Sequence, residues 1–114
     1  MSGITTHVLD TSLGRPAAGV SVSLAVQAQG SWSELARTET GPEGRTGDFL
    51  ALVPGPVRPG GTYRLRFEVG AYFAARGVTA FYPYVEIVFT LLDDRHHHVP
   101  LLVSPFGYST YRGS

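Results

Sequence analysis

The sequence predicts an all-β fold, an antiparallel β-sandwich of seven to eight short strands in one domain spanning residues 1–114. Three observations support this prediction. The chain contains 14 glycines and 8 prolines, which divide it into short pieces. Apolar and polar residues alternate within these pieces, as they do in a strand with one buried face. Turn signals recur about every ten residues, a spacing typical of a sandwich.

The first half of the chain contains three strand candidates, at residues 4–10, 20–26 and 32–40. In the first, alternation puts Ile4 and Val8 on one face and His7 on the other. In the second, valine and leucine alternate with small or polar residues, which indicates a half-buried strand. The third is expected to present one face made of Trp32, Glu34, Ala36 and Thr38.

The second half adds one short apolar segment at 49–53 and two alternating segments at 63–69 and 85–91. The odd-numbered residues of both alternating segments are apolar or aromatic and are expected to face the core. Ala71 to Arg76 breaks the period of two and predicts a helix of one or two turns, which Gly77 ends.

The last nineteen residues, 96–114, carry the most unusual pattern. Alternation puts Val99, Leu101 and Val103 on a core face, and His96 and His98 on the opposite face. A turn signal at 104–107 follows, and Tyr108 to Arg112 alternates again. We therefore expect a final strand that pairs back on the histidine-bearing one.

Composition excludes several classes of function. The chain has no cysteine, so disulfides, thiolate catalysis and cysteine-based metal sites are excluded. Nine basic and nine acidic residues give a net charge of zero without a basic cluster, which argues against a nucleic-acid partner. No apolar run is long enough to span a membrane, and the first residues do not resemble a secretory signal. The simplest expected compartment is the cytoplasm.

The side chains that could carry chemistry are His7, His98 and Arg45. Both histidines lie opposite core-type neighbours, so they are either solvated strand residues or members of a site. We expect no metal, because His96 and His98 have only Asp93 and Asp94 nearby to complete a ligand set. Arg45 follows a glycine-rich turn. It is either a solvated loop residue or a residue whose planar guanidinium donates two hydrogen bonds to a planar, oxygen-rich ligand.

The C-terminal residues Arg112, Gly113 and Ser114 add a cation, a hydroxyl and a carboxylate. The chemistry available to these groups is histidine-assisted addition of water. A neutral imidazole can take a proton from water near pH 7, while an arginine offsets developing negative charge. From the residues alone, the function stays open.

A resemblance goes further than the residues alone. It rests on ordered stretches along the whole chain: residues 4–11 (ITTHVLDT), 14–17 (GRPA), 44–45 (GR), 81–83 (FYP), 98–102 (HVPLL), 104–105 (SP) and 111–114 (YRGS). These stretches resemble the 5-hydroxyisourate hydrolases, the transthyretin-like enzymes of urate degradation. The closing Tyr-Arg-Gly-Ser is the most specific of them. Transthyretin itself, a hormone carrier, has lysine, glutamate and threonine where this chain has His7, Arg45 and His98, so the resemblance favours the hydrolase over a small-molecule carrier or a structural adhesion-type sandwich.

The resemblance implies a transthyretin-like sandwich with one short helix, assembled as a homotetramer (a dimer of dimers) without cofactor or metal. The implied reaction adds water to a carbonyl and opens the ring of 5-hydroxyisourate, giving 2-oxo-4-hydroxy-4-carboxy-5-ureidoimidazoline. The implied site lies in a channel between subunits. His7 and His98 would activate the water, Arg45 would bind ring oxygens, and the tail would shape the pocket from across the dimer interface. The tail residues concerned are Tyr111, Arg112, Gly113 and Ser114, and the resemblance implies that Ser114 is also catalytic, with its hydroxyl or carboxylate contacting the water or a histidine.

The position between the two histidines of the penultimate strand departs from the family, which often has tyrosine there. Here it is His97, whose side chain is expected to point inward beside Val99 or to lie at the rim of the strand, and to be structural.

Overall fold

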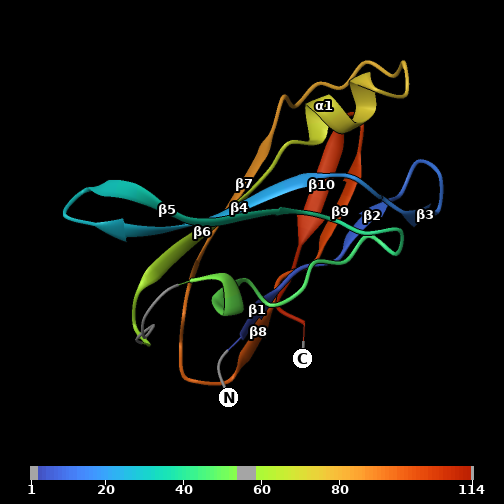
Figure 1. Ribbon diagram of the computed structural model, residues 1–114. Helices are drawn as coiled ribbons and strands as arrows, with labels where there is room; N and C mark the ends of the chain where they lie inside the picture. Colours follow the sequence, from blue (N-terminus) through green and yellow to red (C-terminus); the bar gives the residue numbers. More distant parts are fainter. Residues whose placement is uncertain (1–2, 54–58, 114) are drawn as a thin grey trace.

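The computed structural model describes residues 3–53 and 59–113. This part of the chain forms ten strands, one α-helix and one 3-10 helix (Figure 1). The strands are β1 (Gly3–Thr5), β2 (Val8–Asp10), β3 (Arg15–Pro16), β4 (Ser21–Ala28), β5 (Ser31–Glu39), β6 (Thr62–Phe67), β7 (Val85–Thr90), β8 (His96–His98), β9 (Leu101–Ser104) and β10 (Gly107–Thr110). The helices are α1 (Val69–Ala74) and the 3-10 helix η1 (Phe49–Leu52). Neither helix has the length and apolar character needed to cross a bilayer.

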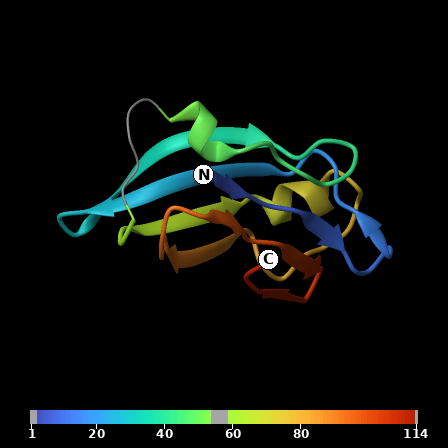
Figure 2. The ribbon, with the colours of Figure 1, turned by 90° about the horizontal axis from the view of Figure 1, so that it is seen from below.

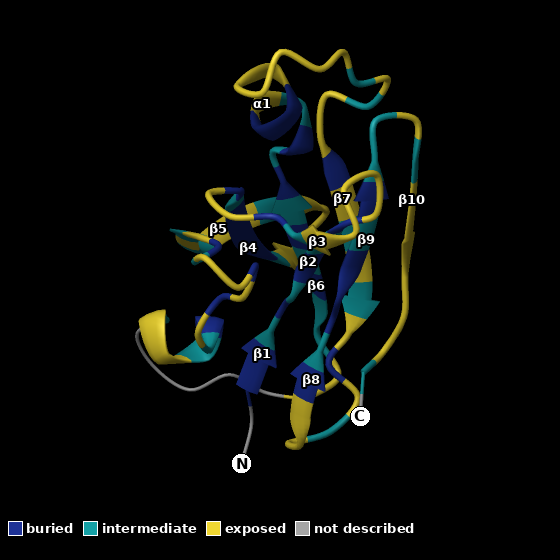
Figure 3. Cartoon of the chain, turned by 90° about the vertical axis from the view of Figure 1, so that its right-hand side faces the viewer, coloured by how far each residue is buried: buried dark blue, intermediate teal, exposed yellow. Residues whose placement is uncertain are grey.

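Two four-stranded sheets form the predicted sandwich (Figures 1 and 2). Their strand orders are β10-β9-β2-β3 and β5-β4-β6-β7, and a separate parallel pair joins β1 to β8. The core lies between the sheets, where Val8 and Leu101 of the first pack with Val22 and Leu65 of the second. Buried residues accordingly fill the interior of the molecule (Figure 3).

Strand β6 shows why alternation predicts these faces. Tyr63, Leu65 and Phe67 are buried, whereas Arg64 and Arg66 between them are half-exposed. Since β6 pairs with β4 on one side and β7 on the other, its backbone groups are satisfied within the sheet. Each buried apolar side chain stabilises the fold by roughly 1.5–3 kcal/mol relative to its exposed state.

Two of the predicted strands are interrupted, which is one reason why ten strands appear in place of seven to eight. The segment 4–10 divides into β1 and β2 because its pairing partner changes from β8 to β9 and β3. At the break, Val8 N donates to Gly44 O (2.8 Å) and Thr46 N donates to Thr6 O (3.3 Å). The histidine strand divides into β8 and β9 at Pro100, which has no N–H to donate. In addition, β3 forms within what the sequence indicated as a turn.

The prediction that one face of residues 32–40 carries Trp32, Glu34, Ala36 and Thr38 is wrong. A β-bulge leaves Leu35 without a partner, because Leu24 pairs with Ala36 while the next residue, Ala25, pairs with Glu34. One extra residue reverses the alternation beyond it. Ala36 and Thr38 therefore share the core side, whereas Trp32 lies on the outer side, where the Arg64 guanidinium stacks 4.6 Å from its ring centroid.

The predicted short helix is present, but its position differs from the prediction. Helix α1 begins at Val69, two residues before the predicted start, and Gly77 follows its end with a φ of 72°. It lies at the end of the molecule opposite to β1 and β8 (Figures 1 and 3). The apolar segment 49–53 forms η1 and no strand, since Asp48 caps it by accepting from Leu50 N at 2.9 Å. The same carboxylate accepts from Ile4 N, which ties η1 to β1.

A buried carboxylate joins the N-terminal strands to α1. Asp10 is 1% exposed and accepts from Tyr72 Oη at 2.8 Å, from the Ser12 hydroxyl and from two backbone amides. Burial alone would raise the pKa of Asp10, but these hydrogen bonds outweigh it and lower the pKa below its usual 3.8. The ionised form is therefore the one that stabilises the fold.

We expect Asp10→Asn to lower the free energy of unfolding by about 1–3 kcal/mol at neutral pH, since a charge-assisted set of hydrogen bonds is lost. A carboxylate with a lowered folded-state pKa stabilises the fold above its unfolded pKa, and this stabilisation disappears as the pH falls through the folded-state value. The difference between wild type and variant should therefore shrink below about pH 4. Urea unfolding at one fixed protein concentration, at neutral and acidic pH, measures it. A pH-independent difference would contradict this account.

Candidate functional site

The candidate site is organised by the parallel pair of β1 and β8. Their register places Gly3 opposite His96, Ile4 opposite His97 and Thr5 opposite His98. Alternation then puts Thr5, His96 and His98 on one face of the pair, while Ile4 and His97 point into the core. The expected orientation of His96 and His98 is thereby confirmed.

His98 is fixed on two sides. Its Nδ1 lies 2.8 Å from Thr5 Oγ1, and Gly113 N donates to its carbonyl oxygen at 2.8 Å. The Gly113 backbone runs so close that a Cβ there would lie 2.6 Å from His98 Cδ2, so any larger residue would displace the ring. Among the described residues, no hydrogen bond occupies His98 Nε2.

The pKa of His98 lies below its usual 6.5. Partial burial is the main cause, and repulsion by the Arg45 guanidinium, and by His7 and His96 when these are protonated, adds to it. Its imidazole is therefore neutral at pH 7, with one ring nitrogen able to accept a proton. This is the state that a general base requires.

His7 and Arg45 lie directly opposite one another in an isolated antiparallel bridge between the N-terminal segment and the loop at 41–46. His7 Nε2 donates to Glu43 O at 2.9 Å, which leaves the lone pair of the neutral ring on Nδ1. Gly44 makes the bridge possible, because its φ is 76° and a Cβ at this position would clash with Val8 O. The exposed Arg45 is thus held beside His7 by backbone pairing.

The C-terminal tail reaches the site through Gly113. Strand β10 pairs with β9 as predicted, but it ends at Thr110, whose hydroxyl donates to Pro100 O at 2.7 Å, two residues before the predicted end. Tyr111 and Arg112 are exposed beyond it. Ser114, which the sequence placed in the site, lies outside the described residues.

His97 is 2% exposed and structural, as expected. Leu92 N donates to its Nε2 at 3.1 Å, and its Nδ1 donates to Arg95 O at 2.8 Å. Because the ring accepts at one nitrogen and donates at the other, it is held as one neutral tautomer. His97 thereby anchors the loop between β7 and β8.

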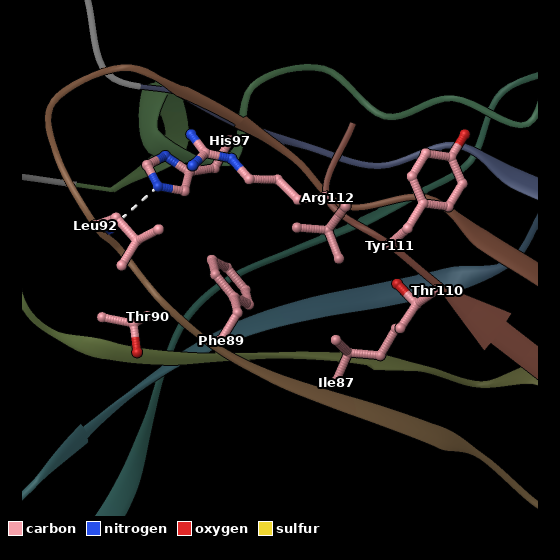
Figure 4. A pocket seen from close by; sticks show the side chains of 9 residues that line it. Ile87, Phe89, Thr90, Leu92, His97, Thr110, Tyr111 and Arg112 are labelled. Carbon is pink, nitrogen blue, oxygen red and sulfur yellow. Dashed lines mark hydrogen bonds between the residues drawn. The ribbon is translucent and has the colours of Figure 1, made fainter. Parts of the chain in front are cut away.

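An apolar pocket of about 410 Å³ lies beside His97 (Figure 4). Its walls come from β7, the following loop, the segment 97–99 and the C-terminal segment 110–112, and comprise Ile87, Phe89, Thr90, Leu92, His97, Val99, Thr110, Tyr111 and Arg112. His7, Arg45 and His98 are not among them. Within one chain, Tyr111 and Arg112 thus line this apolar pocket, whereas the next tail residue, Gly113, contacts His98.

A second, polar hollow adjoins the histidines, lined by Asp93, Arg95, His96, Arg112 and Gly113. No group of three or more potential metal-ligating side chains lies together in the described part of the chain. Alternation along residues 96–104 puts Pro100 on the face opposite Val99, with His98, but Pro100 is buried within one chain. Leu9 and Leu102 are half-buried.

Sequence reasoning passed over Thr5. Alternation places it on the same face as His7, but a threonine in a strand is common and gave no signal of its own. Only the register of β1 against β8 shows that its hydroxyl meets two imidazoles, at 2.7 Å from His96 Nε2 and 2.8 Å from His98 Nδ1.

These features define a transthyretin-like β-sandwich with His98 on β8 and the bridged pair of His7 and Arg45 close enough to His98 to affect its charge. The family model "HIUase/Transthyretin family" matches residues 4–113, and the chain belongs to this family. It is 50% identical to the 5-hydroxyisourate hydrolase of Halalkalibacterium halodurans over 121 residues, covering 100% of both chains. Among solved structures, Klebsiella pneumoniae 5-hydroxyisourate hydrolase is 41% identical with a TM-score of 0.85, covering 100% of both chains. Sea bream transthyretin in complex with thyroxine is 31% identical with a TM-score of 0.86, covering 97% of this chain and 94% of that one.

We expect Arg45→Gln to raise the pKa of His98, because the substitution removes a positive charge that disfavours the imidazolium. An NMR titration of the histidine ring protons measures the change. Arg37→Gln, at an exposed arginine of β5, is the matched control and should leave the titration of His98 unaltered. An unchanged or lowered pKa of His98 in Arg45→Gln would show that the two groups do not interact.

Proposed function

We propose that this protein is a 5-hydroxyisourate hydrolase, which opens the ring of its substrate by adding water and forms 2-oxo-4-hydroxy-4-carboxy-5-ureidoimidazoline. The observation that carries the proposal is the neutral His98 imidazole held near His7 and Arg45. Full-length similarity to hydrolases at 50% and 41% identity supports the same conclusion. The lower identity of 31% to a transthyretin makes a non-catalytic carrier the weaker alternative.

In the proposed mechanism, His98 Nε2 accepts a proton from water as the water oxygen attacks the ring carbonyl carbon. The guanidinium of Arg45 binds the ring oxygens and offsets the negative charge that develops on the attacked carbonyl. The carbon–nitrogen bond then breaks, its electron pair stays on the departing nitrogen, and this nitrogen takes up the proton that His98 Nε2 accepted. His7 assists, with its tautomer set by the Glu43 carbonyl. In the tail, Tyr111, Arg112, Gly113 and Ser114 complete the pocket. Neither a metal nor a cofactor takes part.

We further propose that each subunit is a single domain over residues 1–114 and that four subunits assemble as a dimer of dimers. Leu9 and Leu102 support this, because they are only half-buried on the sheet face that also carries His7 and His98. A second such face would cover them and exclude water from the site. Assembly would also let the tail of one subunit reach the site of another. The cytoplasm is the proposed compartment, which fractionation of the source cells tests.

The central test follows the ultraviolet absorbance of freshly generated 5-hydroxyisourate with catalytic amounts of protein. Wild type should accelerate its decay, whereas His98→Ala and Arg45→Glu should lower kcat/KM by about 10²-fold or more, since each removes a group acting on the reacting atoms. Arg37→Glu is the control for charge reversal. All variants should keep the tetramer in sedimentation experiments. Binding without acceleration by wild type would indicate a carrier instead.

Treatment with EDTA followed by gel filtration should leave kcat/KM unchanged, since imidazole and guanidinium groups supply the proposed chemistry. The same absorbance assay measures this. A loss of rate that Zn²⁺ or another divalent cation restores would refute metal-independence.

A further inference from the structure

The hydroxyl of Thr5 lies between two imidazoles. Its Oγ1 is 2.7 Å from His96 Nε2 and 2.8 Å from His98 Nδ1, both of which are hydrogen-bonding distances. A hydroxyl has one hydrogen, so it donates to one ring and accepts from the other. When both rings are neutral, one of the two nitrogens that face the Thr5 hydroxyl therefore carries a hydrogen and the other does not. Thr5 therefore couples the tautomers of His96 and His98.

Gly3 makes room for this arrangement. It pairs with His96 across β1 and β8, and a Cβ on it would lie 2.5 Å from His96 Nδ1. The absence of a side chain lets the His96 ring lie over the backbone toward Thr5. The same hypothetical Cβ would lie 3.3 Å from Asp48 Oδ2, so this carboxylate lies on the same side of Gly3 as His96 Nδ1. Asp48 is therefore near the edge of the His96 ring that carries Nδ1, whereas Nε2 of the same ring faces Thr5.

We propose that Thr5 is a positioning residue that joins His98 to His96, so that a proton taken up by His98 during hydrolysis is relayed outward to His96. The inference rests on the proposed hydrolase function. Before the step, His98 carries its hydrogen on Nδ1 and donates a hydrogen bond to Thr5 Oγ1. The Thr5 hydroxyl in turn donates a hydrogen bond to His96 Nε2. This leaves His98 Nε2 unprotonated and free to accept from water.

The proposed relay moves protons between three residues and conserves their number and the total charge. His98 Nε2 takes a proton from the attacking water, and the electron pair of the broken O–H bond stays on the oxygen that bonds to the carbonyl carbon. His98 Nδ1 passes its hydrogen to Thr5 Oγ1, and Thr5 passes its own hydrogen to His96 Nε2. His98 ends neutral in its other tautomer, with a hydrogen now on Nε2. The positive charge ends on His96.

The charges around the two rings favour this direction. Near His98, Arg45 and His7 are cationic or can become so, and partial burial disfavours an imidazolium. His96 is exposed, so water screens a charge on it. Charged residues of both signs lie near His96: Asp48 beside Gly3, and Asp93, Arg95 and Arg112 around the polar hollow. The cation is therefore better tolerated on His96 than on His98.

The kinetic test compares Thr5→Val, which keeps the shape and removes the hydroxyl, with Thr5→Ser, which keeps the hydroxyl. Thr5→Val should lower kcat about tenfold with little change in KM, as expected for loss of one hydrogen bond made to the reacting group, and should alter the pH profile of kcat/KM. Thr5→Ser should restore most of the rate. Thr38→Val, at a half-buried position of β5, controls for the substitution itself and should be as fast as wild type. A Thr5→Val variant with wild-type kcat, or a Thr5→Ser variant equally slow, would overturn the relay.

The second test needs no turnover. Ring nitrogen-15 NMR of the free protein, with His96 and His98 assigned through His96→Gln and His98→Asn, reports which nitrogen carries hydrogen. Wild type should show His98 protonated on Nδ1 and His96 unprotonated on Nε2 in their neutral states, and Thr5→Val should lose this pairing. The same tautomers in both proteins, or His98 protonated on Nε2 in wild type, would refute the coupling. If wild type fails to hydrolyse 5-hydroxyisourate, the proposed function fails, and these spectra still decide whether Thr5 couples the rings.

Discussion

The parallel pairing of β1 with β8 is the constraint on which the site depends. It joins Thr5 to His98, which are 93 positions apart in the chain, and places them directly opposite one another. A shift of this register by one residue would turn His96 and His98 into the core and His97 outward. The core opposes such a shift, because Ile4 and His97 are both buried and His97 has both ring nitrogens satisfied there. Apolar packing on one face thus fixes the polar geometry on the other.

Glycines shape the site because they have no side chain and let the backbone approach closely. Gly44 lets the loop at 41–46 approach β2 closely enough for Arg45 to pair with His7. Gly3 and Gly113 lie against the rings of His96 and His98, where a Cβ would collide with each. The position of each imidazole is therefore determined by backbone packed against it, in addition to its hydrogen bonds. Such close backbone contact limits the rotamers that the rings can adopt.

Electrostatics gives these rings their chemical character. A histidine that is partly buried beside an arginine stays neutral, because its imidazolium would lose hydration and gain repulsion. His97 is likewise neutral, but it is held so by a donor at one nitrogen and an acceptor at the other, which leaves it no free position for catalysis. Three consecutive histidines thus have three environments: exposed, buried and half-buried. Their differences follow from alternation along a single strand.

The sequence by itself determined which residues face the core in the strands that contain no bulge or break, because alternation along a regular strand is a local property of the chain. It correctly predicted the buried positions of β6, the C-terminal hairpin, the short helix before Gly77, and the opposite orientations of His97 and His98. Only the tertiary structure decided which strands meet and in what register, since this depends on contacts between distant segments. The bulge at Leu35, the capping of η1 by Asp48 and the contact of Thr5 with two imidazoles all arise there. A threonine or a glycine carries no local pattern that reveals its partner, so their roles became visible only once the strands were in place.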